Sequence, residues 1–447
     1  MRPNTIRQPI IYLAVWLMMP VLCQAQVSEI ATTAFSIDIN GLSFKVPCYV
    51  SKDLTQKDNA VTRFIIVVHG NNRNAADYNL AMLTAAAESQ AMHNTLIVAP
   101  QFLTQTDINH FKPGDDYLFW YNSGWKIGDL SRDTGTNPRD EKISSFSVLD
   151  QLIVHVLSSG NFPEIKDIIV AGFSAGGQFV NRYAASSPVY EQIKQTYGME
   201  IRYMVGAPSS FLYMNNERRV AGSADQFAVP VTNCLEYNDY KYGLNNRNNY
   251  LAQTTDSLLI ARYEARNILY LAGSQDNNPN ASALDKSCPA MLQGGHRLER
   301  MLIYFNFLKY FYGSGIEGRQ QFQVVSGVGH DHNAIFRSAT ARAWMWNDPV
   351  TSVSDERERP GSRLSLAAYP NPASSTAIRF GYYLSEPGPV SLSIYNLAGK
   401  PVQQLVSGIQ QPGNHRVACE AQALSAGIYL AVLQTKNNSV TVKVVVR

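Results

Sequence analysis

Unbroken apolar segments alternate with amphipathic ones over the first three quarters of the chain. Strand-like apolar runs occupy residues 64–68, 94–99, 168–171, 203–205, 267–271 and 322–325. Such runs are typical of strands that are buried on both faces of a parallel sheet. Helical patterns lie between them, at residues 75–90, 145–157, 178–185 and 298–311. The alternation predicts an α/β fold over residues 27–346, with a mostly parallel, doubly wound sheet covered by helices.

The pattern changes after residue 346. Residues 347–362 are polar, charged and contain prolines, and they show no apolar period, so they are predicted to form a linker. Beyond them, short strand patterns at residues 390–394, 427–433 and 440–446 are separated by turn residues, without a convincing helix. Residues 363–447 are therefore expected to form a small all-β sandwich.

Four motifs in this last segment are informative. They are Tyr-Pro-Asn-Pro-Ala at 369–373, Ser-Ile-Tyr-Asn-Leu-Ala-Gly-Lys at 393–400, Leu-Ser-Ala-Gly-Ile-Tyr-Leu at 424–430 and Val-Lys-Val-Val-Val at 442–446. In these motifs the segment resembles the C-terminal sorting domain of the type IX secretion system of Bacteroidetes. The resemblance implies that the secretion machinery is a partner, and that the domain is removed after export. A carbohydrate-binding or fibronectin-like module is the alternative, and no aromatic platform favours it.

The N-terminus is typical of a signal peptide. Arg2 and Arg7 precede an apolar stretch at residues 10–22, and tolerated residues lead to a cleavage point near Ala25. A membrane anchor is the alternative, but the stretch is short for a span. We expect residues 1–25 to be cleaved and the protein to be secreted, extracellular or on the outer cell surface.

Composition excludes some functions. The chain has 447 residues, of which 45% are hydrophobic and 16% charged, and its net charge is +3. These values describe a globular protein. No basic stretch is interleaved with aromatic residues, so a nucleic-acid partner is not expected.

One serine directly follows an apolar strand. Gly172-Phe-Ser174-Ala-Gly176 has the pattern of a nucleophile elbow, in which a strand turns sharply into a helix. Glycines stand where a side chain would clash with the strained turn. A glycine-rich turn without chemistry is the alternative.

An acid and a base follow two later strands. Asp276 comes shortly after the strand at 267–271, and His330 after the strand at 322–325. Ligands collect at the carboxyl ends of strands in open α/β sheets. A histidine there can take the serine proton and deliver it to a leaving group, while a carboxylate fixes the tautomer of the histidine. The sequence thus predicts Ser174, His330 and Asp276 as a triad.

The order serine, acid, histidine is that of the α/β-hydrolase superfamily. The α/β segment resembles this superfamily over most of its length, in particular exported polyhydroxyalkanoate depolymerases and feruloyl or acetylxylan esterases. The resemblance implies a secreted serine hydrolase that cleaves carboxylic esters through an acyl-enzyme, without a cofactor or metal. A serine peptidase on the same fold and a non-catalytic surface binding protein are the alternatives.

Rival residues exist for the base and the acid. His332 lies two residues from His330, but Gly-Val-Gly-His matches the loop of the superfamily better. Asp285 and Asp256 compete with Asp276, yet neither directly follows a strand.

Two backbone N–H groups are expected to form an oxyanion hole. One belongs to Ala175, the residue after the nucleophile, and the other to the loop after an early strand. In that loop, Asn71 is the expected donor, and His69 is interpreted as a structural residue.

A long connection at residues 102–144 is interpreted as a functional insertion. Its aromatic residues, among them Tyr117, Trp120 and Trp125, either bind substrate or pack the insertion against the core, and the sequence favours neither.

Four cysteines remain after the signal peptide, at positions 48, 234, 288 and 419, and an exported protein can oxidise them. Their wide spacing does not suggest a metal site. The pair Cys234–Cys288 is favoured because both residues lie in loop-like stretches that flank the acid, and four buried thiols are the alternative.

Overall fold

The computed structural model describes residues 27–135 and 141–346, and most of 364–446. The parts of the last range that it does not describe are residues 370–372, 374–376, 385, 397–399, 421–422 and 437–438. The predicted signal peptide and the predicted linker lie outside the described residues. The domain boundaries proposed from the sequence therefore stay predictions.

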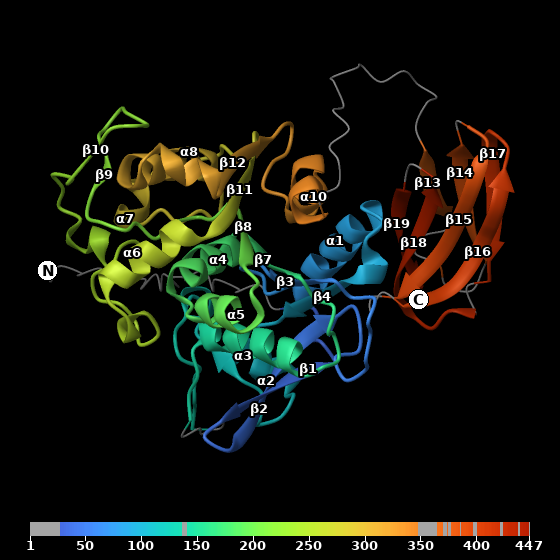
Figure 1. The fold of residues 1–447 in the computed structure, drawn as a ribbon, viewed down its shortest axis with the longest axis horizontal. Coiled ribbons are helices and arrows are strands. Elements are labelled where there is room, and N and C mark those ends of the chain that lie inside the picture. The colour runs from blue at the N-terminus through green and yellow to red at the C-terminus, as the bar shows by residue number, and fades with distance from the viewer. Residues whose placement is uncertain are drawn as a thin grey trace, which may run out of the picture.

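An eight-stranded sheet forms the centre of the first part (Figure 1). Its strands, in spatial order, are β1 (Ala34–Ile39), β2 (Leu42–Val50), β4 (Thr95–Pro100), β3 (Arg63–Val68), β7 (Asp167–Phe173), β8 (Ile201–Gly206), β11 (Asn267–Gly273) and β12 (Gln320–Val325). The six from β4 to β12 run parallel, and β1 and β2 are antiparallel. The mostly parallel sheet predicted from the apolar runs is confirmed.

Helices cover both faces of this sheet. The main ones are α1 (Ala75–Glu88), α3 (Ser145–Ser158), α4 (Ala175–Ser186), α5 (Val189–Tyr197), α6 (Asp256–Ala265), α8 (Arg297–Tyr312), α9 (His332–Arg337) and α10 (Ala339–Trp346). Alternate side chains of β3 divide between the two layers. Phe64 and Ile66 pack in the cluster that includes α3, α4, α6 and α8, whereas Ile65 and Val67 pack with α1, α9 and α10. The central strands are therefore buried on both faces, which explains their unbroken apolar sequences.

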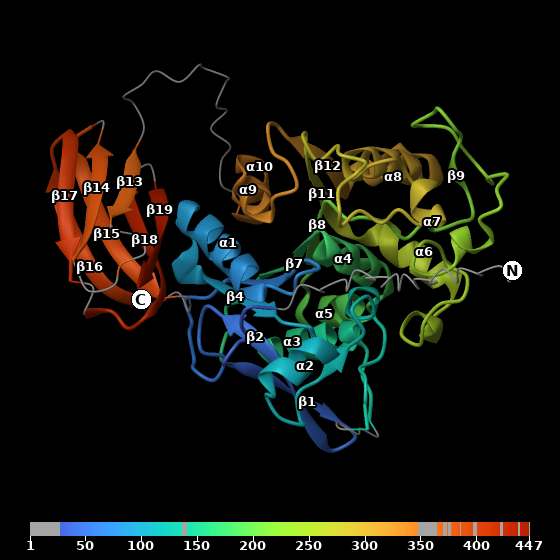
Figure 2. The ribbon, with the colours of Figure 1, turned by 180° about the vertical axis from the view of Figure 1, so that it is seen from behind.

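The strands described in the C-terminal part pair antiparallel in two sheets. One sheet has the order β13 (Ser365–Tyr369), β14 (Ile378–Leu384), β17 (Gly413–Cys419), and the other the order β16 (Pro401–Gln410), β15 (Gly388–Asn396), β18 (Gly427–Thr435), β19 (Ser439–Val446). Strands β18 and β19 lie beside α1 in both ribbon views (Figures 1 and 2). Leu430 and Val432 of β18 join the apolar cluster that contains α1. The predicted all-β region is confirmed.

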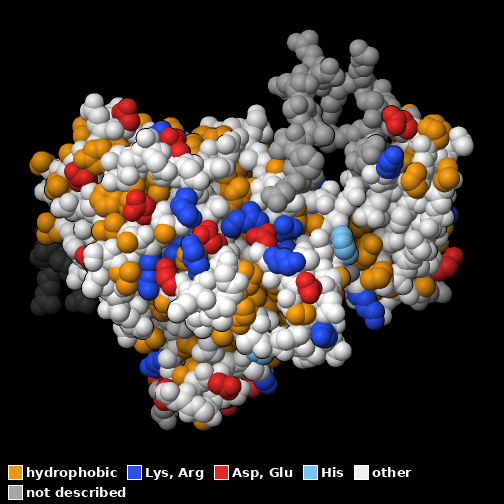
Figure 3. Space-filling view, in the orientation of Figure 1, with side chains coloured by type: hydrophobic (Ala, Val, Ile, Leu, Met, Phe, Trp, Pro, Cys, Tyr) orange, Lys and Arg blue, Asp and Glu red, His pale blue; other side chains and the backbone are white. Residues whose placement is uncertain are grey.

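The surface carries both signs of charge. On the face shown in Figure 3, Lys and Arg side chains lie among Asp and Glu side chains near the middle of the molecule. Elsewhere in the protein, Asp167 forms ion pairs with both Arg63 and Arg202, each at 2.6 Å. Among the described residues, no helix is both long enough and apolar enough to cross a membrane.

Candidate active site

Ser174 occupies the sharp turn between β7 and α4. Its φ of 59° and ψ of −114° are strained for a residue with a side chain. Close backbone packing explains the neighbouring glycines, since a Cβ on Gly176 would lie 2.1 Å from the carbonyl oxygen of Val68. The N–H of Ser174 donates to the carbonyl of Gly206 at 2.8 Å. The turn predicted from the glycine pattern is thus held by backbone contacts to two neighbouring strands.

His330 and Asp276 lie beside this serine. Ser174 Oγ lies 2.9 Å from His330 Nε2, and His330 Nδ1 lies 2.6 Å from Asp276 Oδ2. Asp276 is 5% exposed, and the ring of Phe173 lies 4.7 Å from the imidazole of His330. The carboxylate accepts the Nδ1 proton, which leaves Nε2 to accept the serine proton. The structure therefore brings together the three residues that the sequence placed at separate strand ends.

A buried arginine stands behind the acid. Arg297, at the start of α8, is 2% exposed, and its Nη1 lies 3.6 Å from Asp276 Oδ1. The guanidinium thus lies within ion-pair distance of the carboxylate that contacts His330. Burial lowers the pKa of Arg297, but a guanidinium stays charged at neutral pH. Nothing in the local sequence around Arg297 indicates that its side chain lies against Asp276.

The rival residues lie elsewhere. The ring of His332 stacks on a buried tyrosine of α1 with 4.1 Å between ring centres. Asp285 accepts hydrogen bonds from Lys241 at 3.1 Å and from neighbouring hydroxyl groups. Asp256 pairs with Arg247 at 3.0 Å in the first turn of α6. None of the three contacts the triad.

The β3–α1 loop and the start of α4 carry the two expected oxyanion donors. Among the described residues, neither the N–H of Asn71 nor that of Ala175 donates to another protein group. Both groups therefore remain available to a bound carbonyl oxygen, which is what an oxyanion hole requires.

His69 fixes this loop and is itself fully buried. Its Nε2 accepts the N–H of Phe102 at 3.0 Å, so the proton resides on Nδ1, which donates to the carbonyl of Gly70 at 2.9 Å. Burial lowers the pKa of His69 from 6.5 to about 4. The imidazole is thus neutral at pH 7, and its contacts fit the structural interpretation.

An ion pair braces the same loop from the other side. The Arg73 guanidinium binds Asp107 twice, with Nε–Oδ2 at 2.7 Å and Nη2–Oδ1 at 3.0 Å. Both side chains are buried, and Arg73 Nη1 also donates to the carbonyl of Asn71 at 3.3 Å. Asp107 lies on α2 (Gln105–Phe111), inside the insertion. The insertion therefore holds the oxyanion loop, a role that the sequence analysis did not find.

Two tryptophans of the insertion are buried in the interior of the protein. Trp120 and Trp125 are 1% and 0% exposed, so they do not offer a surface to a substrate. Trp125 packs 4.5 Å from the ring of His69, and Trp120 Nε1 donates to the carbonyl of Asp129 at 3.1 Å. The packing interpretation fits both tryptophans. Tyr117 is half-buried with the Lys45 ammonium 5.7 Å from its ring centre, and its substrate role stays a prediction.

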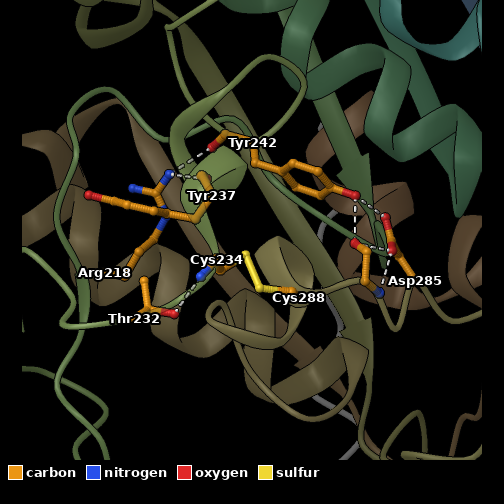
Figure 4. The surroundings of a disulfide bond; sticks show 8 residues. Arg218, Thr232, Cys234, Tyr237, Tyr242, Asp285 and Cys288 are labelled. Carbon is orange, nitrogen blue, oxygen red and sulfur yellow. Dashed lines mark hydrogen bonds between the residues drawn. A yellow bond between two sulfur atoms is a disulfide. The ribbon is translucent and has the colours of Figure 1, made fainter.

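Cys234 and Cys288 form a disulfide, the pairing that the sequence analysis favoured (Figure 4). It joins the 3₁₀ helix η3 (Leu235–Asn238) to the short helix α7 (Cys288–Met291). In the same view Tyr242 reaches across to Asp285, with 2.8 Å between the hydroxyl and Oδ2. Cys48 and Cys419 are buried thiols.

Comparison with solved structures finds hydrolases among the similar folds. Poly(aspartic acid) hydrolase-1 from Sphingomonas sp. KT-1 is 21% identical over 71% of this chain and 99% of its own, with a TM-score of 0.47. A poly(3-hydroxybutyrate) depolymerase from Bordetella parapertussis is 24% identical over 70% and 89%, with a TM-score of 0.45. A feruloyl esterase module from Clostridium thermocellum is 11% identical over 73% and 90%, with a TM-score of 0.31. These scores are too low to carry an argument about activity.

No curated protein matches the chain. Residues 367–447 match the family model of the secretion system C-terminal sorting domain. This match confirms the resemblance seen in the C-terminal motifs and makes the type IX secretion machinery a partner. The chain thus combines a mostly parallel, doubly wound α/β part with a C-terminal sorting domain, and the protein is secreted or held at the cell surface.

Proposed function

We propose that the protein is a serine hydrolase that cleaves carboxylic esters outside the cell through an acyl-enzyme. The observation that carries the proposal is the continuous hydrogen-bond chain from Asp276 through His330 to Ser174, built from three separate strand ends. A serine hydroxyl is a weak nucleophile at its free pKa and needs an adjacent base in this geometry.

The chemistry follows from the positions of these atoms. Ser174 Oγ attacks the ester carbonyl while His330 Nε2 takes its proton. The N–H groups of Asn71 and Ala175 bind the oxyanion, and the loss of one such donor typically costs about 3–4 kcal/mol of transition-state stabilisation. The imidazolium, stabilised by Asp276, then protonates the leaving alcohol. Water repeats the sequence on the acyl-enzyme and releases the acid.

The ester class rests on the resemblance of the sequence to depolymerases and feruloyl esterases, because a fold does not determine a substrate. A serine peptidase would use the same triad. A non-catalytic binding protein would need no intact triad, and the hydrogen-bonded chain of three residues argues against it.

The test is active-site labelling with a fluorophosphonate, followed by mapping of the modified peptide. We expect a single modification at Ser174, which is lost in Ser174→Ala and in His330→Ala. His332→Ala is the matched control, because its imidazole lies off the triad, and it should still be labelled. A folded protein that is not labelled would contradict the triad and favour the binding-protein alternative.

Turnover of a matched pair of substrates separates the two enzyme classes. We expect p-nitrophenyl acetate to be hydrolysed and p-nitroacetanilide, which differs in the ester oxygen, to be left intact. Cleavage of the anilide at a comparable rate would favour the peptidase.

A further inference from the structure

A short 3₁₀ helix lies against the proposed site. This helix, η2 (Trp125–Ile127), is anchored by the ring of Trp125, which packs 4.5 Å from His69 and 6.5 Å from Phe179 of α4. Lys126 extends from it, and its ammonium lies 3.5 Å from the side-chain oxygen of Asn71. Because Asn71 is a proposed oxyanion donor, Lys126 places a cation at the rim of the site.

A second loop brings further cations to the same place. Tyr240 and Asn248 both donate side-chain hydrogen bonds to the carbonyl of Ile127, so this loop is docked on η2. Lys241 follows Tyr240, and its carbonyl accepts the Nε–H of Arg182 of α4 at 3.2 Å. Positive charges from three elements therefore lie near one another. They are Arg182 of α4, Lys126 of η2 and Lys241 of the docked loop.

Among the described residues, one carboxylate forms an ion pair with this group, and that pair involves only Lys241. Asp285 pairs with Lys241 at 3.1 Å. Arg182 is fully buried and gives its hydrogen bonds to two carbonyl oxygens and the Ser210 hydroxyl. Within the described ranges, Lys126 forms no ion pair, and its only polar partner is the amide of Asn71. One half-buried ammonium is thus left without a counter-anion.

The electrostatic surroundings of Lys126 are positive overall. Burial, the Lys241 ammonium and the Arg182 guanidinium lower the pKa of Lys126 to about 8, and Asp285 only partly opposes them. The ammonium is still charged at neutral pH, and an anion that binds there would offset both the desolvation and the repulsion. A lysine acts as a point charge and binds carboxylates and phosphates alike. Because the proposed reaction is the hydrolysis of carboxylic esters, the matching anion is a free carboxylate carried by the ester.

We propose that Lys126, with Lys241 and Arg182 behind it, binds a carboxylate of the substrate, so that the enzyme prefers esters that carry a free acid group. This inference rests on the proposed ester hydrolysis and names its substrate class. The disulfide Cys234–Cys288 and the Tyr242–Asp285 contact hold the loop that carries Lys241 (Figure 4).

The test compares two pairs of esters, in each of which one ester carries a carboxylate and the other a neutral group at the same position. One pair carries the charge on the acyl side, p-nitrophenyl hydrogen succinate against p-nitrophenyl butyrate. The other carries it on the alcohol side, 4-acetoxybenzoate against 4-acetoxybenzamide. We expect wild-type kcat/KM to favour the acid in one pair, and the acid-to-neutral ratio to fall about tenfold in Lys126→Met, since charged hydrogen bonds contribute about 1.5–3 kcal/mol. The preference should also weaken as ionic strength rises.

Lys166→Met is the matched control, because this exposed lysine lies just before β7, at the opposite edge of the sheet from the proposed site, and pairs with Glu164 at 3.8 Å. Its ratio should equal that of wild type. If Lys126→Met does not fold, Lys241→Met provides the second variant. Equal rates for acid and neutral esters, or an unchanged ratio in both variants, would overturn the carboxylate site while leaving ester hydrolysis intact. Failure to hydrolyse any of the four esters would instead contradict the proposed function.

Discussion

The protonation of His69 should make the stability of the α/β part depend on pH. In the unfolded chain the imidazole titrates near 6.5, whereas burial lowers its pKa in the fold to about 4. Between these values the unfolded state binds a proton that the folded state excludes. Stability is therefore complete above pH 6.5 and is lost as pH falls through the window toward 4.

The magnitude follows from the same shift. Each pKa unit corresponds to about 1.4 kcal/mol, so His69 alone should remove about 2 kcal/mol between pH 8 and pH 5, and about 3 kcal/mol below pH 4. His69→Gln removes the titration while its side-chain oxygen can still accept the N–H of Phe102. The variant should lose about 1 kcal/mol at pH 8, for the missing hydrogen bond to the Gly70 carbonyl. Its stability should then decrease less with acidification than that of wild type.

Urea unfolding at pH 8, 6.5 and 5, at constant ionic strength, measures this difference. Tryptophan fluorescence is a suitable signal, since Trp125 is buried against the His69 ring. His110→Gln, at an exposed histidine, is the matched control and should follow wild type. The reasoning would be refuted if wild type and His69→Gln lost the same free energy between pH 8 and pH 5.

Three further changes test the framework of the site. Gly176→Ala places a methyl group 2.1 Å from the last carbonyl oxygen of β3, so we expect at least about 3 kcal/mol of destabilisation and loss of fluorophosphonate labelling. Gly315→Ala is the control, because its methyl group would meet no atom within 4 Å, and it should change neither stability nor labelling. Asp107→Asn removes the carboxylate that binds the buried Arg73 twice, so we expect a cost of about 3–5 kcal/mol in urea unfolding and a fall in kcat. An unchanged kcat would refute the link between this ion pair and the β3–α1 loop. Cys288→Ser removes the disulfide that closes a loop of 54 residues, and it should lower the free energy of unfolding by up to about 4 kcal/mol. Wild type treated with dithiothreitol is the comparison and should lose the same amount.

The sharp turn that carries Ser174, the proposed nucleophile, could be predicted from sequence because its geometry is local. The glycines beside Ser174 are fixed by the turn itself, and any chain that builds this elbow must place residues without side chains there. Asp276 and His330 were found by a rule of the fold, since they follow strands whose carboxyl ends meet at one edge. The parallel sheet was visible for a similar reason, because strands buried on both faces leave unbroken apolar runs.

The insertion shows where this reasoning stops. Trp120, Trp125 and Lys126 are close in sequence, yet the tryptophans point into the core and the lysine reaches the rim. In an irregular segment the apolar residues do not recur with a period of 2 or 3.6 residues, so the sequence does not indicate which side chains face the core. The sequence therefore identified the insertion and its aromatic residues, but it left open whether they bind substrate or pack against the core.

The residues that escaped sequence reasoning share a physical property, which is that they are charged and at least partly buried, and that the groups they contact are distant along the chain. Asp107 braces a loop 34 residues before it, and Lys126 meets the loop of Lys241 only because both pack on α4. A buried charge without its partner is costly, so each of these side chains demands a specific contact, but nothing in its own neighbourhood names that contact. For Lys126 the fold supplies no anionic partner among the described residues. A buried charge is stable only when it is paired, and we therefore propose that the carboxylate that pairs with Lys126 comes from the substrate.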